Sequence, residues 1–307
     1  MAQDPQKTVG GQAVIEGVMM RAPDGWAVAA RNPEGRIEAQ RGELPRLSTR
    51  SVAARIPFVR GVMVLGESLS LGMRALGWSA RVAGEDEEEI GGPAMVLSMV
   101  VALAFAIGLF VLVPTFFAKW VAQGNEVVLA VVETVLRVAL FVGYVWAIGR
   151  WEDIARVYQY HGAEHKTIHA YERGDQLSIV EIQKYSPAHP RCGTSFLLLV
   201  LLISSVTFGL LGDLDWLWLV ASRILLIPVI AGVSYEILRF SGITEGWLAA
   251  VVAAPGLWLQ KLTTAEPDDG MVEVAIASLL NALSDEARDE ALARGPVPPA
   301  AIDVELH

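Results

Sequence analysis

The stretch AMVLSMVVALAFAIGLFVLVPTFFA, residues 94–118, contains no charged side chain. An α-helix of this length spans the roughly 30 Å hydrocarbon core of a lipid bilayer. Three more apolar runs follow, at residues 127–148, 195–211 and 216–235. Buried helices of a large soluble core are the alternative, but four such runs in one chain favour a membrane. The sequence therefore predicts an all-α integral membrane protein with about four transmembrane helices and the lipid bilayer as its surroundings.

The overall composition points the same way. Of 307 residues, 53% are hydrophobic and 19% are charged, which is more apolar than an ordinary soluble domain. Much of the net charge of −10 lies in GEDEEE (84–89) and near the C-terminus, in segments expected to be solvated. No basic patch with interleaved aromatic residues is present, so nucleic acid is excluded as a partner.

Positive charge sets the expected orientation, because Lys and Arg gather in cytoplasmic connections. They lie before the first span and between the second and third: Arg50, Arg55, Arg60, Arg74, Arg81, Arg150, Arg156, Lys166, Arg173, Lys184 and Arg191. The polar start MAQDPQKT indicates no cleavable signal peptide. We therefore expect a multi-pass membrane protein with both termini and the histidine-rich loop in the cytoplasm. A single cysteine, Cys192, suits that reducing compartment.

The segments outside the spans have distinct patterns. WAVAARNPEGRIEAQ (26–40) predicts two short strands around an Asn-Pro-Glu-Gly turn. The apolar segment 242–262 is interrupted by Pro255-Gly256, which predicts a re-entrant or interfacial segment, followed by an amphipathic helix. The expected organisation is a disordered start (1–8), a small β-rich N-terminal cytoplasmic cap (9–50), amphipathic or interfacial helices with an acidic linker (51–93), transmembrane helices 1 and 2 (94–149), a cytoplasmic His/Cys loop (150–194), transmembrane helices 3 and 4 (195–235), the re-entrant segment with C-terminal amphipathic helices (236–294) and a disordered tail (295–307).

Three of the five histidines lie in YHGAEHKTIHAYE, residues 160–172. If residues 156–173 are helical, one face of about 140° carries potential ligands. These are His161, Glu164, His165, His169 and Glu172. Imidazole nitrogens and carboxylate oxygens suit a divalent metal, zinc above all. His161 and His169 are separated by about 12 Å along the axis, so a single ion requires an adjacent i, i+4 pair.

His161 to His165 also fits the pattern H-x-x-E-H, in which the glutamate acts as general base for a metal-bound water. A third ligand must then come from another segment. The stretch SPAHPRCGTS, which precedes the third span, offers His189 or Cys192. A hydrogen-bonded or proton-handling histidine cluster without metal is one alternative. A plain structural role at the membrane interface is another.

Charged residues inside the expected spans form a second group of candidates. Glu133 and Arg137 are four residues apart in the second span, and Arg223 lies in the fourth. Such residues are costly in a bilayer and are functional candidates by default. The alternative is mutual neutralisation, with a Glu133–Arg137 pair and Arg223 reaching toward Asp213 or Asp215.

Several strings together resemble the bacterial DUF1385 family. They are GGQAVIEGVMMR (10–21), RGV (60–62), YHGAEHKTIHAYE (160–172), PRCGTSF (190–196), AGVSYE (231–236) and LQKLTTAEPDDGMVEVAIASL (259–279). The resemblance covers nearly the whole chain. It implies a metal-dependent membrane enzyme of unestablished substrate. The residues it carries over are His161, Glu164, His165 and Cys192, and more loosely Glu16 and Glu236. It favours Cys192 over His189 as the third ligand.

The leading expectation is a metal-dependent hydrolase at the cytoplasmic membrane face. A non-enzymatic partner in membrane-protein assembly or biogenesis, with a structural His/Cys cluster, is the rival class. A small transporter or channel lined by the intramembrane charges is the third. Partner membrane proteins or a homo-oligomer would fit either of the last two.

Overall fold

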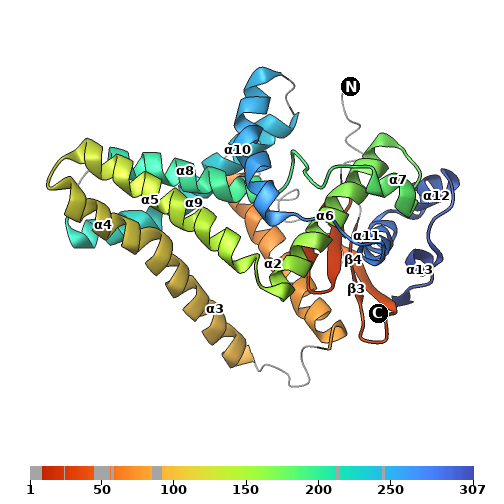
Figure 1. Ribbon diagram of the computed structural model, residues 1–307. Helices are drawn as coiled ribbons and strands as arrows, with labels where there is room; N and C mark the ends of the chain where they lie inside the picture. Colours follow the sequence, from red (N-terminus) through yellow and green to blue (C-terminus); the bar gives the residue numbers. More distant parts are fainter. Residues whose placement is uncertain are drawn as a thin grey trace.

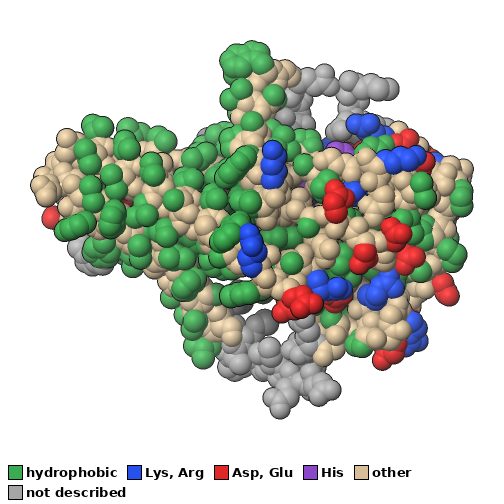
Figure 2. Space-filling model, viewed as in Figure 1, with side chains coloured by type: hydrophobic (Ala, Val, Ile, Leu, Met, Phe, Trp, Pro, Cys, Tyr) green, Lys and Arg blue, Asp and Glu red, His purple; other side chains and the backbone are tan. Residues whose placement is uncertain are grey.

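The computed structural model describes residues 9–23, 25–44, 56, 59–84, 92–211, 214–243 and 246–307. Apolar helices form a bundle on one side, and a β-sheet with its covering helices forms a separate domain on the other (Figure 1). Hydrophobic side chains cover the bundle, whereas charged side chains gather on the sheet domain (Figure 2). The expected disordered start at 1–8 and the acidic run at 85–89 lie outside the described residues.

Seven helical elements make up the apolar part. They are α3 (Gly92–Ile107), η3 (Gly108–Leu112), α4 (Val113–Ala122), α5 (Glu126–Ile148), α8 (Thr194–Leu210), α9 (Trp216–Ile243) and α10 (Trp247–Thr263). Three helices are long and apolar enough to cross a membrane: Val100–Ala122, Glu126–Ile148 and Val220–Phe240. The third span expected from the sequence is the shorter apolar helix α8. At 17 residues it is about 26 Å long.

A projection formed by the end of α9 and the beginning of α10 stands away from the other bundle helices (Figure 1). Its outward side chains are large and apolar, with Phe240, Trp247 and Val251 exposed. The sequence interpretation of a break at Pro255-Gly256 is wrong in one respect, because α10 continues through Pro255. Gly256 has a packing role: a Cβ added there would lie 2.0 Å from Ser195 Oγ and 2.9 Å from Ser195 Cα, so α8 and α10 approach each other closely at this point.

The sheet has five strands in the order β1-β2-β3-β4-β5. They are β1 (Gly10–Val14), β2 (Gly17–Arg21), β3 (Gly25–Arg31), β4 (Ile37–Glu43) and β5 (Glu305–Leu306). The first four are antiparallel, and β5 is parallel to β4. The β3–β4 hairpin confirms the two strands expected around the Asn-Pro-Glu-Gly turn, in which Gly35 has a φ of 83°. That left-handed conformation favours glycine.

Both faces of the sheet are covered by helices. Helices α6 (Glu152–Arg173) and α11 (Asp269–Ala282) pack on one face, and α2 (Val59–Val82) packs on the other. Residues Met271 to Ala282 of α11 are almost all buried, so this segment is a core helix and not the amphipathic helix that the sequence predicts. The short helices α7 (Ile179–Gln183) and α12 (Asp285–Ala293) complete the domain.

The C-terminal tail is ordered, contrary to the expectation of disorder for 295–307. It forms helix α13 (Pro299–Ile302) and then strand β5. The backbone N–H of His307 donates to the Ala39 carbonyl oxygen at 2.9 Å, and the His307 ring contacts the Glu38 carboxylate at 2.9 Å. The last residues of the chain therefore complete a sheet that begins at its first described residues.

Three connections between the bundle and the sheet domain meet beside α6. Helix α5 leads directly into α6, the segment after α7 leads into α8, and α10 leads into α11. This arrangement brings residues 158–165, 187–195 and 260–265 together, since hydrogen bonds join Ala265 to Tyr158 and His189 to Gln260. The histidine-rich segment thus lies where the apolar and polar parts of the molecule join.

Candidate metal centre

Helix α6 confirms the helix expected over residues 156–173. Glu152 and Asp153 occupy its first turn, where negative charge is favourable, and Gly174 ends it with a φ of 78°. Because residues four apart share a helix face, His161 and His165 point to the same side. Their ring centroids are 4.4 Å apart.

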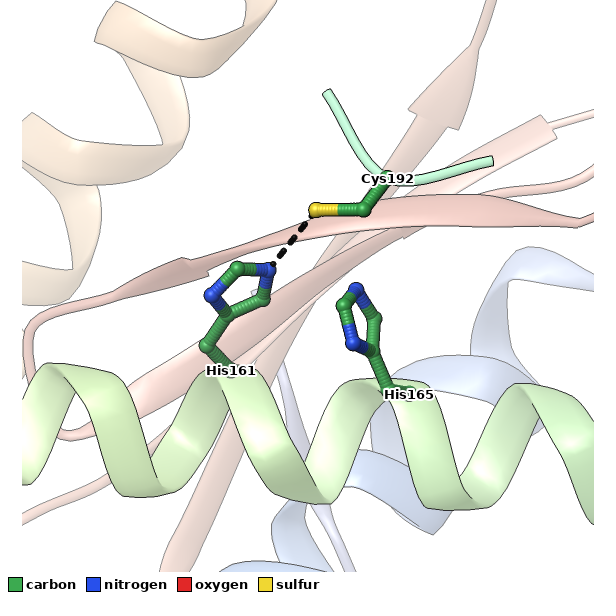
Figure 3. Close-up of side chains that lie close together, drawn as sticks. All are labelled: His161, His165 and Cys192. Carbon is green, nitrogen blue, oxygen red and sulfur yellow. Dashed lines mark hydrogen bonds between the residues drawn. The ribbon is translucent and has the colours of Figure 1, made fainter. Parts of the chain in front are cut away.

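Cys192 completes a group of three potential ligands with these histidines (Figure 3). One ligand atom from each of the three residues lies within 4.8 Å of the other two. His161 Nε2 and Cys192 Sγ are 3.2 Å apart. His165 and Cys192 are buried, and His161 is partly buried. The three could hold one ion with imidazole and thiolate, which is a ligand set typical of zinc.

Backbone carbonyls orient both imidazole rings. His161 Nδ1 donates to the Thr263 carbonyl oxygen at 2.8 Å, and His165 Nδ1 donates to that of Pro187 at 2.6 Å. Because a carbonyl can only accept, each Nδ1 carries the ring proton and each Nε2 is unprotonated, with that of His161 facing the Cys192 sulfur. Burial lowers the pKa of both histidines, most strongly that of His165, which favours these neutral forms. Metal-binding histidines are commonly fixed in this way.

The Cys192 side chain lies in a turn just before α8. Its sulfur contacts Thr194 Oγ1 at 3.2 Å and accepts from the Thr194 backbone N–H at 3.4 Å. Burial, together with the nearby Glu164, raises the pKa of the thiol to about 12. The thiol is therefore protonated at neutral pH, and an ion that binds here must displace that proton.

Glu164 lies between α6 and strand β1. It is 3% exposed, and its carboxyl group forms a hydrogen bond with the Gly11 backbone. Its Oε2 atom is buried and has no hydrogen-bond partner among the described residues. Burial raises the pKa of Glu164 to about 8. The sequence predicted that Glu164 shares a helix face with the histidines. In the structure its side chain points toward the sheet instead. Its charge still contributes to the raised pKa of the Cys192 thiol.

His189 and His169 have other partners. His189 Nδ1 accepts from the Arg191 backbone N–H at 3.3 Å, and its Nε2 lies 3.7 Å from Glu172 Oε2. His169 Nε2 lies 3.0 Å from the Ala188 carbonyl oxygen. Glu172 also pairs with Arg191. These residues form a second layer behind His165, and Cys192 is the residue that joins His161 and His165.

Glu16 and Glu236 lie in ion pairs and not in this group. Glu16 pairs with Arg156 and accepts from Tyr160 Oη at 3.3 Å, which ties the β1–β2 turn to α6. Glu236 accepts two hydrogen bonds from Arg60, at 2.6 and 2.7 Å, which ties α9 to α2.

The intramembrane charges form a cluster of their own. Glu133 pairs with Arg137, and Arg223 Nη2 lies 3.3 Å from Glu133 Oε1. Arg223 therefore points toward Glu133, although the sequence interpretation directed it toward Asp213 or Asp215; Asp213 lies outside the described residues. Arg137 Nε donates to the Phe110 carbonyl oxygen at 3.0 Å, within the π-helical segment η3, where a carbonyl is released from the regular helix ladder.

Sequence patterns could not identify every important group. The carbonyls of Thr263 and Pro187 are backbone atoms, so no side-chain signal marks them. The Gly10-Gly11 pair gave a usable signal, because adjacent glycines permit close approach of the backbone. A Cβ at Gly11 would lie 3.0 Å from Glu164 Oε1 and 2.5 Å from the Met19 carbonyl oxygen.

The chain therefore belongs to the class of proteins that join apolar helices of membrane-spanning length to a β-sheet domain. In this chain a His/His/Cys group lies at the junction. Comparison with known sequences then gives the family. The profile described as "Protein of unknown function (DUF1385)" matches residues 56–285. The chain is also 35% identical over 303 residues to "Uncharacterized protein YqhQ" of Bacillus subtilis (strain 168), covering 92% of this chain and 94% of that protein. The chain belongs to the DUF1385 family. No solved structure matches it.

Proposed function

We propose that this protein is a metal-dependent hydrolase embedded in the bacterial inner membrane, with its site at the cytoplasmic face. His161, His165 and Cys192 would hold zinc or a similar divalent ion, and Glu164 would act on a water molecule beside it. The observation that carries the proposal is the combination of three converging ligand atoms with a buried carboxylate oxygen, Glu164 Oε2, that has no partner among the described residues.

The donor set fits a catalytic ion. Three protein ligands leave one position of a tetrahedral ion for water or substrate. A bound divalent ion lowers the pKa of water and polarises a carbonyl or phosphoryl oxygen. The chain's own contribution is to fix the two Nε2 lone pairs through Thr263 and Pro187, and to keep Glu164 in a buried position. Positive charge nearby would lower the pKa of Glu164 from about 8, making it a base at neutral pH.

The membrane arrangement belongs to the same proposal. Counting α8 as the shorter third span gives four crossings, which return the chain to the side on which it began. The excess of Lys and Arg before the first span and between the second and third supports a cytoplasmic site and cytoplasmic termini. The apolar helix α10, which follows the fourth crossing, would then lie at the membrane surface as an interfacial segment.

The test starts with metal. Elemental analysis of purified wild type should find about one zinc per chain, and His165→Ala should lose it. Replacing zinc by Co²⁺ reports on the coordination, since the visible spectrum should show a thiolate ligand and should change when azide or acetohydroxamate takes the open position. Glu164→Gln should keep the metal but fail to restore function in cells that lack the gene. Purified wild-type protein without bound metal would contradict the proposal.

A structural clasp is the second candidate, and one observation favours it. The ligands come from α6 and from the turn that enters α8, so an ion would tie the sheet domain to the apolar bundle. A clasp would be closed, with Glu164 or another group as fourth ligand. The visible spectrum of the Co²⁺ form would then stay the same when azide is added, and Glu164→Gln would lower metal content. Such a protein would act as a partner in membrane-protein assembly.

A further inference from the structure

The two edges of the sheet are different. Strand β5, at one edge, has two residues, whereas β1, at the other, has five and is paired on one side among the described residues. Protected edges are usually short, charged, proline-containing or covered. The β1 sequence GGQAV contains neither charge nor proline, and Gly10 and Gly11 are exposed. This edge is therefore suited to pairing with another strand.

The hairpin geometry shows which groups of β1 face outward. A two-residue turn closes on the pair Val14–Gly17. Hydrogen-bonded and non-hydrogen-bonded pairs alternate along antiparallel strands, so Gln12 also bonds to β2 while Gly11 and Ala13 face away. The hydrogen bond from the Gly11 backbone to Glu164 agrees with this alternation.

The same edge lies in fixed register with the metal centre. Helix α6 runs alongside β1, with Arg156 bound to Glu16 at one end and Glu164 bound to Gly11 at the other. Gly11 is close to Glu164 because a side chain is absent there. A chain that paired with Ala13 would thus run past the carboxyl group of Glu164, which lies against Gly11.

We propose that the substrate is an extended polypeptide segment that adds to the sheet along the outer edge of β1. This inference rests on the proposed hydrolase function and names its substrate class. Main-chain hydrogen bonds supply affinity in strand addition and are insensitive to side-chain identity. Pairing with β1 brings a peptide carbonyl past Glu164 and toward the three ligand atoms.

The reaction is hydrolysis of a peptide bond. The oxygen of water forms a bond to the carbonyl carbon, and the C–N bond breaks. Glu164 accepts one proton from that water and delivers it to the leaving nitrogen, so the products are a carboxylic acid and an amine, which then ionise to carboxylate and ammonium. No redox partner or further co-reactant is needed.

The first experiment uses zinc-loaded, full-length protein in lipid nanodiscs. A library of unstructured peptides and vesicles of phosphatidylethanolamine with phosphatidylglycerol are offered separately. New peptide termini that disappear in Glu164→Gln support the inference. Hydrolysis of lipid without cleavage of peptides overturns it while leaving the hydrolase function intact. Absence of both, with a cobalt spectrum insensitive to azide, overturns the hydrolase function itself.

The second experiment tests the pairing and leaves the protein unchanged. A cleaved peptide is made with a single backbone N-methyl group at each position in turn. Methylation at alternate positions should lower kcat/KM about tenfold, because each such position loses one hydrogen bond to β1. Loss without a period of two contradicts strand pairing. In the protein, Ala13→Pro should reproduce the loss with normal metal content, because it removes an N–H group that faces away from β2.

Discussion

His161 Nε2 lies 3.2 Å from Cys192 Sγ, although 31 residues separate them in sequence. The contact joins a helix of the sheet domain to the turn that begins an apolar helix of the bundle. It also extends an i, i+4 histidine pair to a group of three potential ligands.

Removal of one ligand should release the ion while leaving the fold largely intact. We expect Cys192→Ser to lower zinc affinity at least tenfold, because a neutral hydroxyl is a poorer ligand than thiolate. His169→Ala is the matched control, since that ring contacts the Ala188 carbonyl and lies outside the group of three. Competition with a chromophoric zinc chelator measures both. Equal loss in the two variants would contradict the assignment of ligands.

Metal binding should depend on pH with a definite sign. The thiol of Cys192 has a pKa of about 12 without metal, so binding releases its proton throughout the neutral range. Burial lowers the pKa of both histidines, so these add little near pH 7. Apparent affinity should therefore rise about tenfold per pH unit for that proton. Cys192→Asp should flatten the dependence, because its carboxylate is already ionised. Calorimetry in buffers of different ionisation enthalpy counts the protons released.

Gly11 should tolerate no side chain. Gly11→Val places a Cβ 2.5 Å from the Met19 carbonyl oxygen, which belongs to backbone and cannot move away. We expect a loss of about 1–3 kcal/mol in the free energy of unfolding of the sheet domain. Gly10→Val is the control, because nothing lies within 4 Å of a Cβ at Gly10. Thermal unfolding followed by circular dichroism compares them; similar melting temperatures would contradict the packing described.

The close contact between α8 and α10 should likewise tolerate no side chain at Gly256. Gly256→Ala puts a methyl group 2.0 Å from Ser195 Oγ and 2.9 Å from its Cα. We expect lower thermal stability in detergent and displacement of the turn that carries Cys192. Gly143→Ala, in α5, meets nothing within 4 Å and should be neutral or slightly stabilising. Zinc content and melting temperature should both fall for Gly256→Ala alone.

The carboxylate of Glu133 lies against two guanidinium groups, the buried one of Arg137 and the partly buried one of Arg223. Glu133→Gln leaves Arg137 and Arg223 without that carboxylate, so we expect a loss of about 3–5 kcal/mol in folding stability. Glu126→Gln, an exposed position in the first turn of the same helix, should change stability little. Resistance to unfolding in graded detergent denaturant measures the difference. Normal stability with altered ion flux in Glu133→Gln would instead favour a transporter.

Hydropathy and helical periodicity were the sequence patterns that predicted most of the structure. Long apolar runs predicted helices at 94–118 and 127–148, and the spacing of His161 and His165 predicted their shared face. The residue patterns alone could not choose between His189 and Cys192 as the third potential ligand. Both lie in the segment before α8, and its local conformation determines which side chain approaches His161 and His165. The contact of Arg223 with Glu133 was not predicted for a similar reason, because it depends on how α5 and α9 pack together.

Other features had too little local signal. Two residues, Glu305 and Leu306, form β5 only because β4 is there to receive them. A proline usually interrupts a helix, yet α10 continues through Pro255. Helix α11 was expected to be amphipathic, but the sheet and α6 enclose it. In each case contacts distant in sequence override a local pattern.

The pairing of β5 with β4 has a consequence for synthesis of the protein. Strands β1 to β4 leave the ribosome first, and α11 and β5 leave last, after every apolar helix. The hydrophobic core of the sheet domain therefore stays incomplete during membrane insertion. A chain truncated before residue 269 would place its apolar helices in the bilayer and still lack the core against which α6 packs.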